Sequence, residues 1–328
     1  MLDLPSFEVH RPTSAAEAAR LAGALPNAVF LAGGTDLLPN LKHRLIDAEH
    51  LIAVDRLPEL RGVELLEDGA LRIGAATTLH ELATSELIAR EAPALAAAAA
   101  AIAGPQHRRA GTLGGNLLLD TRCLFYNQTP AWREALGHCL KREGSLCHVI
   151  GSTTTCVAAH SADTVPALMA MNAVADILRG DEALHVPVAE LYAQDGRYAL
   201  NPHPGRQALV LGVRIPPRAP GHRGVYRKVR AREAIDFPQL GLAVCASFSD
   251  EGVVTHLSAA MTALLPRPKV VERLKVAIGT KLEDAVIDKL SQAAWQQCKP
   301  QASIHGSPEW RREMARVEMR RALVALRG

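Results

Sequence analysis

The chain has 328 residues, 48% of them hydrophobic, and its 37 lysines and arginines nearly balance its 34 aspartates and glutamates. This length allows two or three domains with cores of their own, and a net charge of +3 gives no basis for nucleic acid or an anionic membrane as the main partner. No basic segment followed by an apolar run marks the N-terminus, and the alanine run at 96–101 is too short to cross a bilayer, so we expect a cytoplasmic protein without a membrane span.

Residues 1–55 have the pattern of a small α/β subdomain. Ser14 and Glu17 have the spacing of a capping box, and apolar residues follow at helical intervals. The apolar run 28–31 predicts a short strand, and the all-apolar run 51–54 suits a parallel strand buried on both faces. We therefore expect a helix followed by two strands in a small N-terminal α/β unit.

Residues 56–216 form a second predicted unit. A strand is expected at 71–75, a buried helix in the alanine-rich stretch 95–103, and a closing strand at 208–215. Pro216-Pro217 then marks a domain boundary.

Residues 217–328 form the third predicted unit. Three strand-like runs near Val225, Leu242 and Val254 precede helices, and the last helix carries an apolar stripe opposite a face rich in arginine. A solvated helix face explains these arginines better than a nucleic-acid surface does. We therefore expect an α+β protein of three units.

Two glycine turns carry the first chemical signal. The first glycine turn, residues 32–36, reads A-G-G-T-D, and the second glycine turn, residues 111–116, reads G-T-L-G-G-N. Consecutive glycines present unobstructed N–H groups, so each turn can form an anion nest and the two together can clamp a pyrophosphate. Neither turn has the pattern of a Rossmann site or a P-loop. A tight turn without a ligand is the alternative for each.

Four of the six cysteines lie within 34 residues, which is the second chemical signal; they are Cys123, Cys139, Cys147 and Cys156. Clustered cysteines in a reducing compartment more often bind metal or do redox chemistry than form disulfides. No C-x-x-C pair occurs, so the spacing matches neither a zinc ribbon nor a bacterial ferredoxin. An iron-sulfur centre, structural zinc with help from His138 or His148, and four unrelated buried thiols all stay open. Cys245 and Cys298 stand alone and suit core packing.

Taken in order, the two glycine turns resemble the FAD-binding motifs of the flavoprotein subunits of the xanthine dehydrogenase family of molybdenum hydroxylases. The similarity continues through A-H-S-A-D at 159–163 and Y-R-K-V-R at 226–230. It implies two α/β subdomains that enclose FAD, followed by a C-terminal domain of antiparallel strands and helices. The cofactor-binding residues that it implies are Ala32, Gly33, Gly34, Thr35, Asp36, Thr112, Gly114, Gly115, Asn116, Asp163 and Lys228.

The segment from about 120 to 160 departs from most of that family. It inserts about 40 residues with the cysteines, and its start at 123–128, C-L-F-Y-N-Q, resembles the β subunit of 4-hydroxybenzoyl-CoA reductase. The resemblance implies a 4Fe-4S cluster on the four cysteines. The cysteines are flanked by Arg122, Arg133, Lys141 and Arg142, which suit tuning of a cluster, docking of an acidic ferredoxin or, most commonly, a solvated surface.

The resemblance also implies partners and a reaction. It predicts a large subunit with molybdopterin, a small subunit with two 2Fe-2S clusters, and reduced ferredoxin as the donor for reductive dehydroxylation of 4-hydroxybenzoyl-CoA to benzoyl-CoA. The chain itself carries no molybdopterin signature and no predicted catalytic residue. Two other functions stay open, namely the flavoprotein subunit of a conventional molybdenum hydroxylase and a zinc-stabilised nucleotide-binding module.

Overall fold

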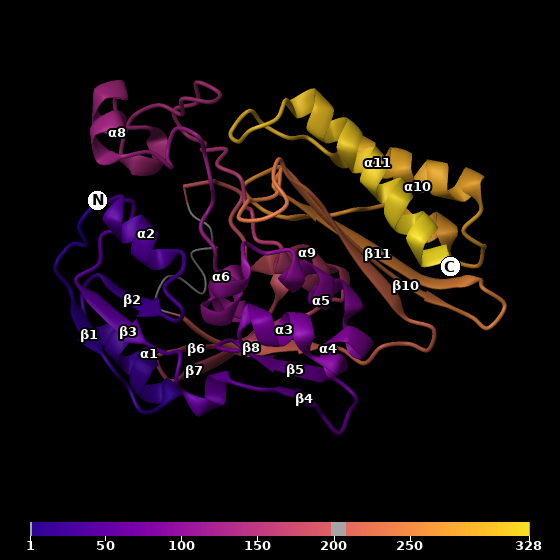
Figure 1. The fold of residues 1–328 in the computed structure, drawn as a ribbon, viewed down its shortest axis with the longest axis horizontal. Helices are drawn as coiled ribbons and strands as arrows, with labels where there is room; N and C mark the ends of the chain where they lie inside the picture. The colour runs from indigo at the N-terminus through magenta and orange to yellow at the C-terminus, as the bar shows by residue number, and fades with distance from the viewer. Residues whose placement is uncertain (1, 198–207, 328) are drawn as a thin grey trace.

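The computed structural model describes residues 2–197 and 208–327 and contains three β-sheets, one from each successive part of the chain (Figure 1). This is the expected combination of α/β units and a C-terminal antiparallel domain. Within the described ranges, no helix has both the length and the apolar character needed to cross a membrane.

The N-terminal sheet has three parallel strands in the order β1-β3-β2. Its elements are β1 (Glu8–His10), α1 (Ala15–Ala24), β2 (Ala28–Leu31), α2 (Leu37–Lys42) and β3 (His50–Ala53). The Ser14 side chain accepts a hydrogen bond from the N–H of Glu17, which confirms the predicted start of α1. Alternate strand residues face opposite sides, so Ile52 packs with α1 whereas Leu51 packs with α2.

The second sheet has five strands in the order β4-β5-β8-β6-β7, all antiparallel. Its strands are β4 (Val63–Leu65), β5 (Leu71–Gly74), β6 (Val174–Arg179), β7 (Glu182–Pro187) and β8 (Leu209–Ile215). The helices and 3-10 turns of this unit are η1 (Pro58–Leu60), α3 (Leu79–Thr84), α4 (Glu86–Glu91), α5 (Pro93–Ala100), α6 (Pro105–Ala110), α7 (Leu113–Leu117), α9 (Thr164–Ala170) and η3 (Val188–Glu190). The predicted alanine-rich helix is confirmed as α5, which ends at Ala100, three residues earlier than expected.

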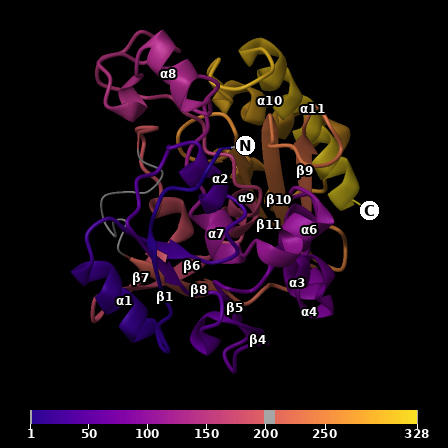
Figure 2. The same cartoon turned by 60° about the vertical axis from the view of Figure 1, so that its left-hand side comes forward.

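The third sheet has four antiparallel strands in the order β12-β11-β10-β9. Its elements are β9 (Arg223–Val229), β10 (Leu240–Phe248), β11 (Val254–Thr262), β12 (Lys269–Val270), η4 (Leu274–Ala277), α10 (Asp284–Gln297) and α11 (Pro308–Arg327). Every residue of β10 is buried. Ala243 and Cys245 pack into the core of the second unit, whereas Leu242 and Val244 pack beneath α10 and α11 (Figure 2).

Residues 120–160 form a lobe with little regular structure, here called the cysteine lobe, which contains α8 (Pro130–Leu136) and η2 (Leu140–Arg142). Both views show α8 set apart from the three sheets and near α2 (Figures 1 and 2). The lobe is attached to the segment after α2, because the Tyr126 hydroxyl donates to the Leu45 carbonyl at 2.9 Å and the buried Arg133 guanidinium donates to the carbonyls of His43 and Arg44.

Candidate functional site

The two glycine turns touch each other, although they lie about 80 residues apart in the sequence. The backbone of Gly33 lies so close to the second turn that an added Cβ would overlap the carbonyl oxygen of Ala110. On the other side of this contact, a Cβ placed on Gly111 would lie 3.3 Å from Thr35 Oγ1. Glycine is therefore required at position 33 because two backbone segments meet there.

The first glycine turn has free amides. Gly34 has a positive φ of 69°, which a branched residue rarely adopts. Among the described residues, the N–H groups of Gly33, Gly34 and Thr35 donate to no protein acceptor outside regular elements. Three consecutive N–H groups without partners form a concavity suited to a phosphate.

The second glycine turn differs from the prediction. The Thr112 side chain caps α7 by accepting from the N–H of Gly115 at 3.1 Å. The amides of Leu113, Gly114 and Asn116 also have protein acceptors, at 2.9, 2.8 and 3.0 Å. Among the described residues, the Thr112 N–H is the one amide of this turn without a protein acceptor, so the second turn offers fewer free amides than the first, and the clamp of two anion nests stays a prediction. Gly114 instead allows close packing, since a Cβ there would lie 2.9 Å from the Cβ of Ala75.

Asp163 and Lys228, which the resemblance places beside the flavin, form a buried ion pair. Lys228 Nζ lies 3.0 Å from Asp163 Oδ2, and the Tyr226 hydroxyl donates to Asp163 Oδ1 at 2.6 Å. Both charged side chains are at most 5% exposed. Asn116 of the second glycine turn lies beside them, because its Oδ1 accepts from the N–H of Thr164 at 3.1 Å.

The surroundings of this ion pair shift the pKa of Asp163 in opposite directions. Burial raises the pKa of Asp163, while the Lys228 ammonium and the Tyr226 hydroxyl act to lower it. Lys228 Nζ also donates to the carbonyl of Ala101 at 3.1 Å, just after the C-terminus of α5, where a positive charge is favoured. Arg230 donates to the same carbonyl at 3.0 Å. The ion pair thus joins α9, α5 and β9 at one point.

Asp36 links the first glycine turn to the cysteine lobe. One of its carboxylate oxygens pairs with the Arg122 guanidinium, and the other accepts from Asn40 Nδ2 at 2.8 Å. Arg122 precedes the first cysteine of the lobe and stacks over the Phe237 ring at 4.7 Å. Burial lowers the pKa of Arg122 to about 10, so the side chain stays charged at neutral pH. The expectation of a solvated surface is therefore wrong for Arg122.

The four clustered cysteines line one cavity of about 10 Å³ within the cysteine lobe. The side chains that complete its lining are Phe125, Tyr126, Leu140, Lys141, His148 and Val149. Burial raises the pKa of Cys156 to about 12 and also raises the pKa of Cys123, so these two thiols stay protonated at neutral pH unless a metal cation displaces the proton. Cys245 and Cys298 are fully buried elsewhere, as expected.

The spacing of these sulfurs does not fit one zinc ion. Among the described residues, no three cysteine sulfurs lie within 4.8 Å of one another. A tetrahedral zinc site with Zn–S bonds of about 2.3 Å places its sulfurs about 3.8 Å apart. Of the two histidines considered as extra ligands, His138 is exposed and outside the cavity lining, and His148 lines the cavity while its Nε2 contacts the Gly137 carbonyl at 2.9 Å.

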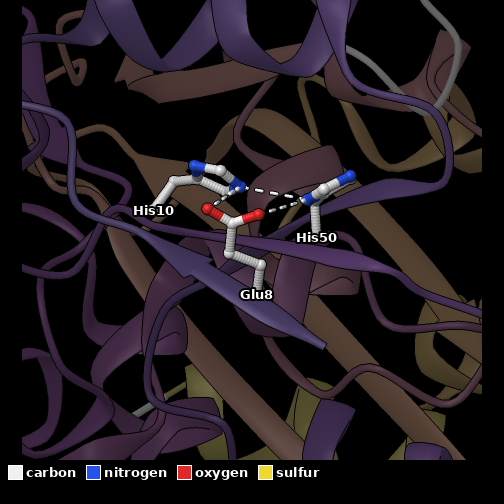
Figure 3. Close-up of side chains that lie close together, drawn as sticks. All are labelled: Glu8, His10 and His50. Carbon is white, nitrogen blue, oxygen red and sulfur yellow. Dashed lines mark hydrogen bonds and ion pairs between the residues drawn. The ribbon is translucent and has the colours of Figure 1, made fainter. Parts of the chain in front are cut away.

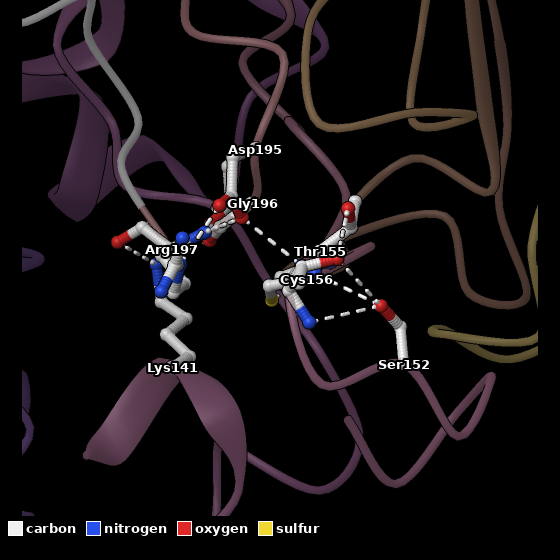
Figure 4. A network of polar contacts seen from close by, with 10 residues as sticks. Lys141, Ser152, Thr155, Cys156, Asp195, Gly196 and Arg197 are labelled. Carbon is white, nitrogen blue, oxygen red and sulfur yellow. Dashed lines mark hydrogen bonds and ion pairs between the residues drawn. The ribbon is translucent and has the colours of Figure 1, made fainter. Parts of the chain in front are cut away.

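Lys141 is another flanking charge that the structure buries, as it does Arg133. Its ammonium donates to Asp120 at 2.9 Å, to Thr121 Oγ1 at 2.7 Å and to the Gly196 carbonyl at 2.9 Å. The loop that supplies Gly196 also fixes Cys156, whose N–H donates to Asp195 Oδ1 at 3.0 Å (Figure 4). Sequence reasoning missed this loop because it lies about 40 residues beyond Cys156.

Comparisons with known proteins agree with this architecture. The family described as "FAD binding domain in molybdopterin dehydrogenase" matches residues 5–218, and the "CO dehydrogenase flavoprotein C-terminal domain" matches residues 225–326. The chain is 32% identical over 321 residues to the carbon monoxide dehydrogenase medium chain of Afipia carboxidovorans, covering 97% of this chain and 96% of that one.

Two further similarities span almost the whole chain. The putative xanthine dehydrogenase FAD-binding subunit of Escherichia coli is 29% identical over 313 residues, covering 95% of this chain and 92% of its own. The solved carbon monoxide dehydrogenase of Hydrogenophaga pseudoflava superposes with a TM-score of 0.79 at 27% identity and covers 98% of both chains. With its FAD-binding domain, its C-terminal domain and these relatives, the chain belongs to the FAD-binding subunits of the xanthine and carbon monoxide dehydrogenase type of molybdenum hydroxylases.

Proposed function

We propose that the chain is the FAD-carrying electron-transfer subunit of a complex with a large molybdenum-binding subunit and a small iron-sulfur subunit. The observation that carries the proposal is the contact between the two glycine turns beside a buried Asp163–Lys228 pair. The names of the relatives support the assembly, since two are medium chains of carbon monoxide dehydrogenases and another is an FAD-binding subunit of a xanthine dehydrogenase.

Each part of the proposed flavin site has a distinct role. The free amides at 33–35 bind phosphate, and the positive φ of Gly34 orients them. Asn116 positions Thr164, which follows Asp163, and the Lys228 ammonium donates to the Asp163 carboxylate. Bound FAD supplies chemistry in steps of one or two electrons. Ala32 and Thr35 shape the first turn, while Thr112, Gly114 and Gly115 fix the start of α7 against β5.

We further propose that Cys123, Cys139, Cys147 and Cys156 ligate a 4Fe-4S cluster. Two observations support it: four sulfurs from separate parts of the lobe face one buried cavity, and they lie too far apart for one zinc ion. A cluster spaces its thiolates more widely, because each one binds a different iron. The buried Lys141 offsets part of the negative charge of the thiolates.

The direction of electron flow separates two versions of this function. Four thiolates disfavour reduction and lower the potential, which suits uptake of an electron from reduced ferredoxin and delivery inward for the dehydroxylation of 4-hydroxybenzoyl-CoA. The start of the lobe at 123–128 supports this version. The second candidate is a conventional dehydrogenase that passes electrons outward, and the names of the relatives, which are dehydrogenases of xanthine and carbon monoxide, favour it.

Iron and flavin analysis of cysteine variants tests the cluster. Each of the four cysteines is changed to serine in the assembled complex, and Cys245→Ser serves as the control because it is equally buried but lies in β10. We expect a loss of about four irons per chain when the whole cluster is lost, because serine oxygen is a poorer ligand for cluster iron, while FAD content stays unchanged. Unchanged iron in all four variants contradicts the cluster and leaves the flavin proposal standing.

A second assay tests the direction of electron flow. The assembled complex is mixed with reduced ferredoxin and 4-hydroxybenzoyl-CoA, and the formation of benzoyl-CoA is measured. The inward version predicts turnover that each of the four cysteine variants loses. Oxidation of an aldehyde, a heterocycle or carbon monoxide by a complex that does not reduce the acyl-CoA contradicts it and supports the conventional dehydrogenase.

A further inference from the structure

A second set of metal-ligating side chains lies on the N-terminal sheet, far along the chain from the cysteines. Glu8 and His10 are two residues apart on β1, and His50 begins β3. In the parallel register Glu8 pairs with His50 and His10 pairs with Ile52. Residues two apart in a strand share a face, so this register places all three side chains on one face of the sheet (Figure 3).

The ligand atoms of the three side chains lie within 4.8 Å of one another, close to the separations of a coordination shell. His10 Nε2 lies 3.1 Å from His50 Nδ1, and the Glu8 carboxylate oxygens lie 3.9 Å from His10 Nε2 and 3.6 Å from His50 Nδ1. Ligands about 2.1 Å from a zinc ion are separated by about 3.0 to 3.4 Å for angles between 90° and tetrahedral. Small rotations of the side chains are enough to bring the three atoms around one ion.

The chemical types of the three side chains also suit a zinc ion. Two imidazoles and one carboxylate are the protein ligands of one common class of zinc site, in which a fourth position is left for water. The two imidazoles are about four-fifths buried, whereas the Glu8 side chain is 67% exposed, so the site opens to solvent on one side. Without a metal, a hydrogen bond between the two imidazoles with Glu8 beside it is the alternative use of these atoms.

We propose that Glu8, His10 and His50 bind a divalent ion of the zinc class and thereby fasten the edge strand β1 to β3. His10 coordinates through Nε2 and His50 through Nδ1, so each imidazole carries its remaining proton on its other nitrogen. The site does not depend on the flavin or on the cysteine lobe, since its ligands come only from the first and third strands of the N-terminal sheet.

Equilibrium dialysis of the purified protein against Zn²⁺ tests the site, with bound metal measured by elemental analysis. We expect His10→Ala and His50→Ala each to bind about one equivalent less than the wild type. Glu8→Gln keeps the site but weakens it at least about tenfold, since a neutral amide oxygen replaces a carboxylate. The matched control is His305→Ala, which removes an exposed histidine elsewhere and leaves the stoichiometry unchanged.

A Co²⁺ titration separates this site from the cysteines. Cobalt on imidazole and carboxylate gives weak visible absorption, whereas cobalt on thiolates adds intense near-ultraviolet charge transfer. We expect the two histidine variants to lose the first signal and retain the second, while their unfolding temperatures in the absence of metal match that of the wild type. Wild-type zinc stoichiometry in both variants overturns the proposal, as does loss only of the thiolate signal.

Discussion

The flavin region and the cysteine lobe are built in opposite ways. The flavin region, made of the two glycine turns and the Asp163–Lys228 pair, depends on contacts between segments up to about 130 residues apart. The cysteine lobe collects its four thiols from one stretch of 34 residues, although side-chain and backbone hydrogen bonds also join it to Asp36, Leu45, Asp195 and Ser303. A substitution in the flavin region should therefore lower the stability of the whole fold. A substitution in the cysteine lobe should affect only the lobe.

Loss of the buried ion pair should give the largest effect and tests the first half of this contrast. Lys228→Met leaves the Asp163 carboxylate buried without its cation, which typically costs about 3–5 kcal/mol. The free energy of unfolding, measured by urea denaturation at pH 7, checks this. Arg316→Met, which breaks the exposed Glu313 pair on α11, is the control and should leave the stability nearly unchanged. Equal effects of the two variants would contradict the assigned role of the pair.

A glycine change in the flavin region should remove the cofactor. The Cβ of a Gly33→Ala variant would overlap the Ala110 carbonyl, so the two turns must separate at a cost of about 1–3 kcal/mol. We expect loss of FAD, measured by absorbance of the purified complex, with iron retained. The control is Gly23→Ala in α1, where an added Cβ meets nothing within 4 Å and should stabilise the helix by up to about 1 kcal/mol.

The equivalent glycine-to-alanine substitution in the cysteine lobe should remove iron and leave FAD bound. The backbone of Gly144 packs against His138, and an added Cβ would overlap the His138 carbonyl oxygen. Gly144→Ala should therefore displace the neighbouring Cys139 and lower the iron content while FAD stays bound. Measuring both cofactors in the Gly33 and Gly144 variants gives a direct comparison of the regions. Loss of FAD in the Gly144 variant would show that the lobe is not independent.

His160 lies at the junction of the two regions and predicts a dependence on pH. Burial lowers the pKa of His160 to about 3, whereas an unfolded histidine has a pKa of about 6.5. The unfolded state therefore binds more protons below pH 6.5, and stability falls on acidification by up to about 1.4 kcal/mol per pH unit. Urea denaturation at pH 7.5 and pH 5 should show a smaller loss of stability for His160→Gln than for the wild type. The same loss in both proteins would exclude His160 as the source.

The smallest effect is expected where the lobe meets the N-terminal unit at the surface. Arg142 pairs with Asp47 at 3.0 Å, and the Asp47 side chain is 69% exposed. Exposed ion pairs contribute about 0.2–1 kcal/mol, so Arg142→Ala should change stability by no more than that and leave both FAD and iron in place. A loss of iron in this variant would show that a surface contact holds the cysteine lobe closed.

Local patterns predicted the elements better than the contacts between them. The strand at 28–31, the start of α1 at Ser14 and the glycine turn that follows β2 all have signals within a few residues. The hairpin of β6 and β7 was missed, although Gly180-Asp181 between two alternating runs is a turn signal that would have indicated it.

The parts of the site that escaped prediction depend on distant partners. The burial of Arg122 requires Asp36 and Phe237, and the engaged amides of the second glycine turn require acceptors in the segment after β5. The grouping of Glu8, His10 and His50 depends on the strand register, which no short motif encodes. Resemblance to a family did assign Asp163 and Lys228 to one site, where the structure pairs them, because it carries long-range information that periodicity lacks.

The double burial of β10 has a consequence for how this protein can be divided. Ala243 and Cys245 complete the core of the second unit, while Leu242 and Val244 on the opposite face belong to the core beneath α10 and α11. A fragment that stops near the Pro216-Pro217 linker would leave the apolar surface of α5 and α9 uncovered, and such surfaces promote aggregation. We therefore expect that the FAD-binding domain, expressed without the C-terminal domain, does not fold stably, because the C-terminal strands cover part of its core.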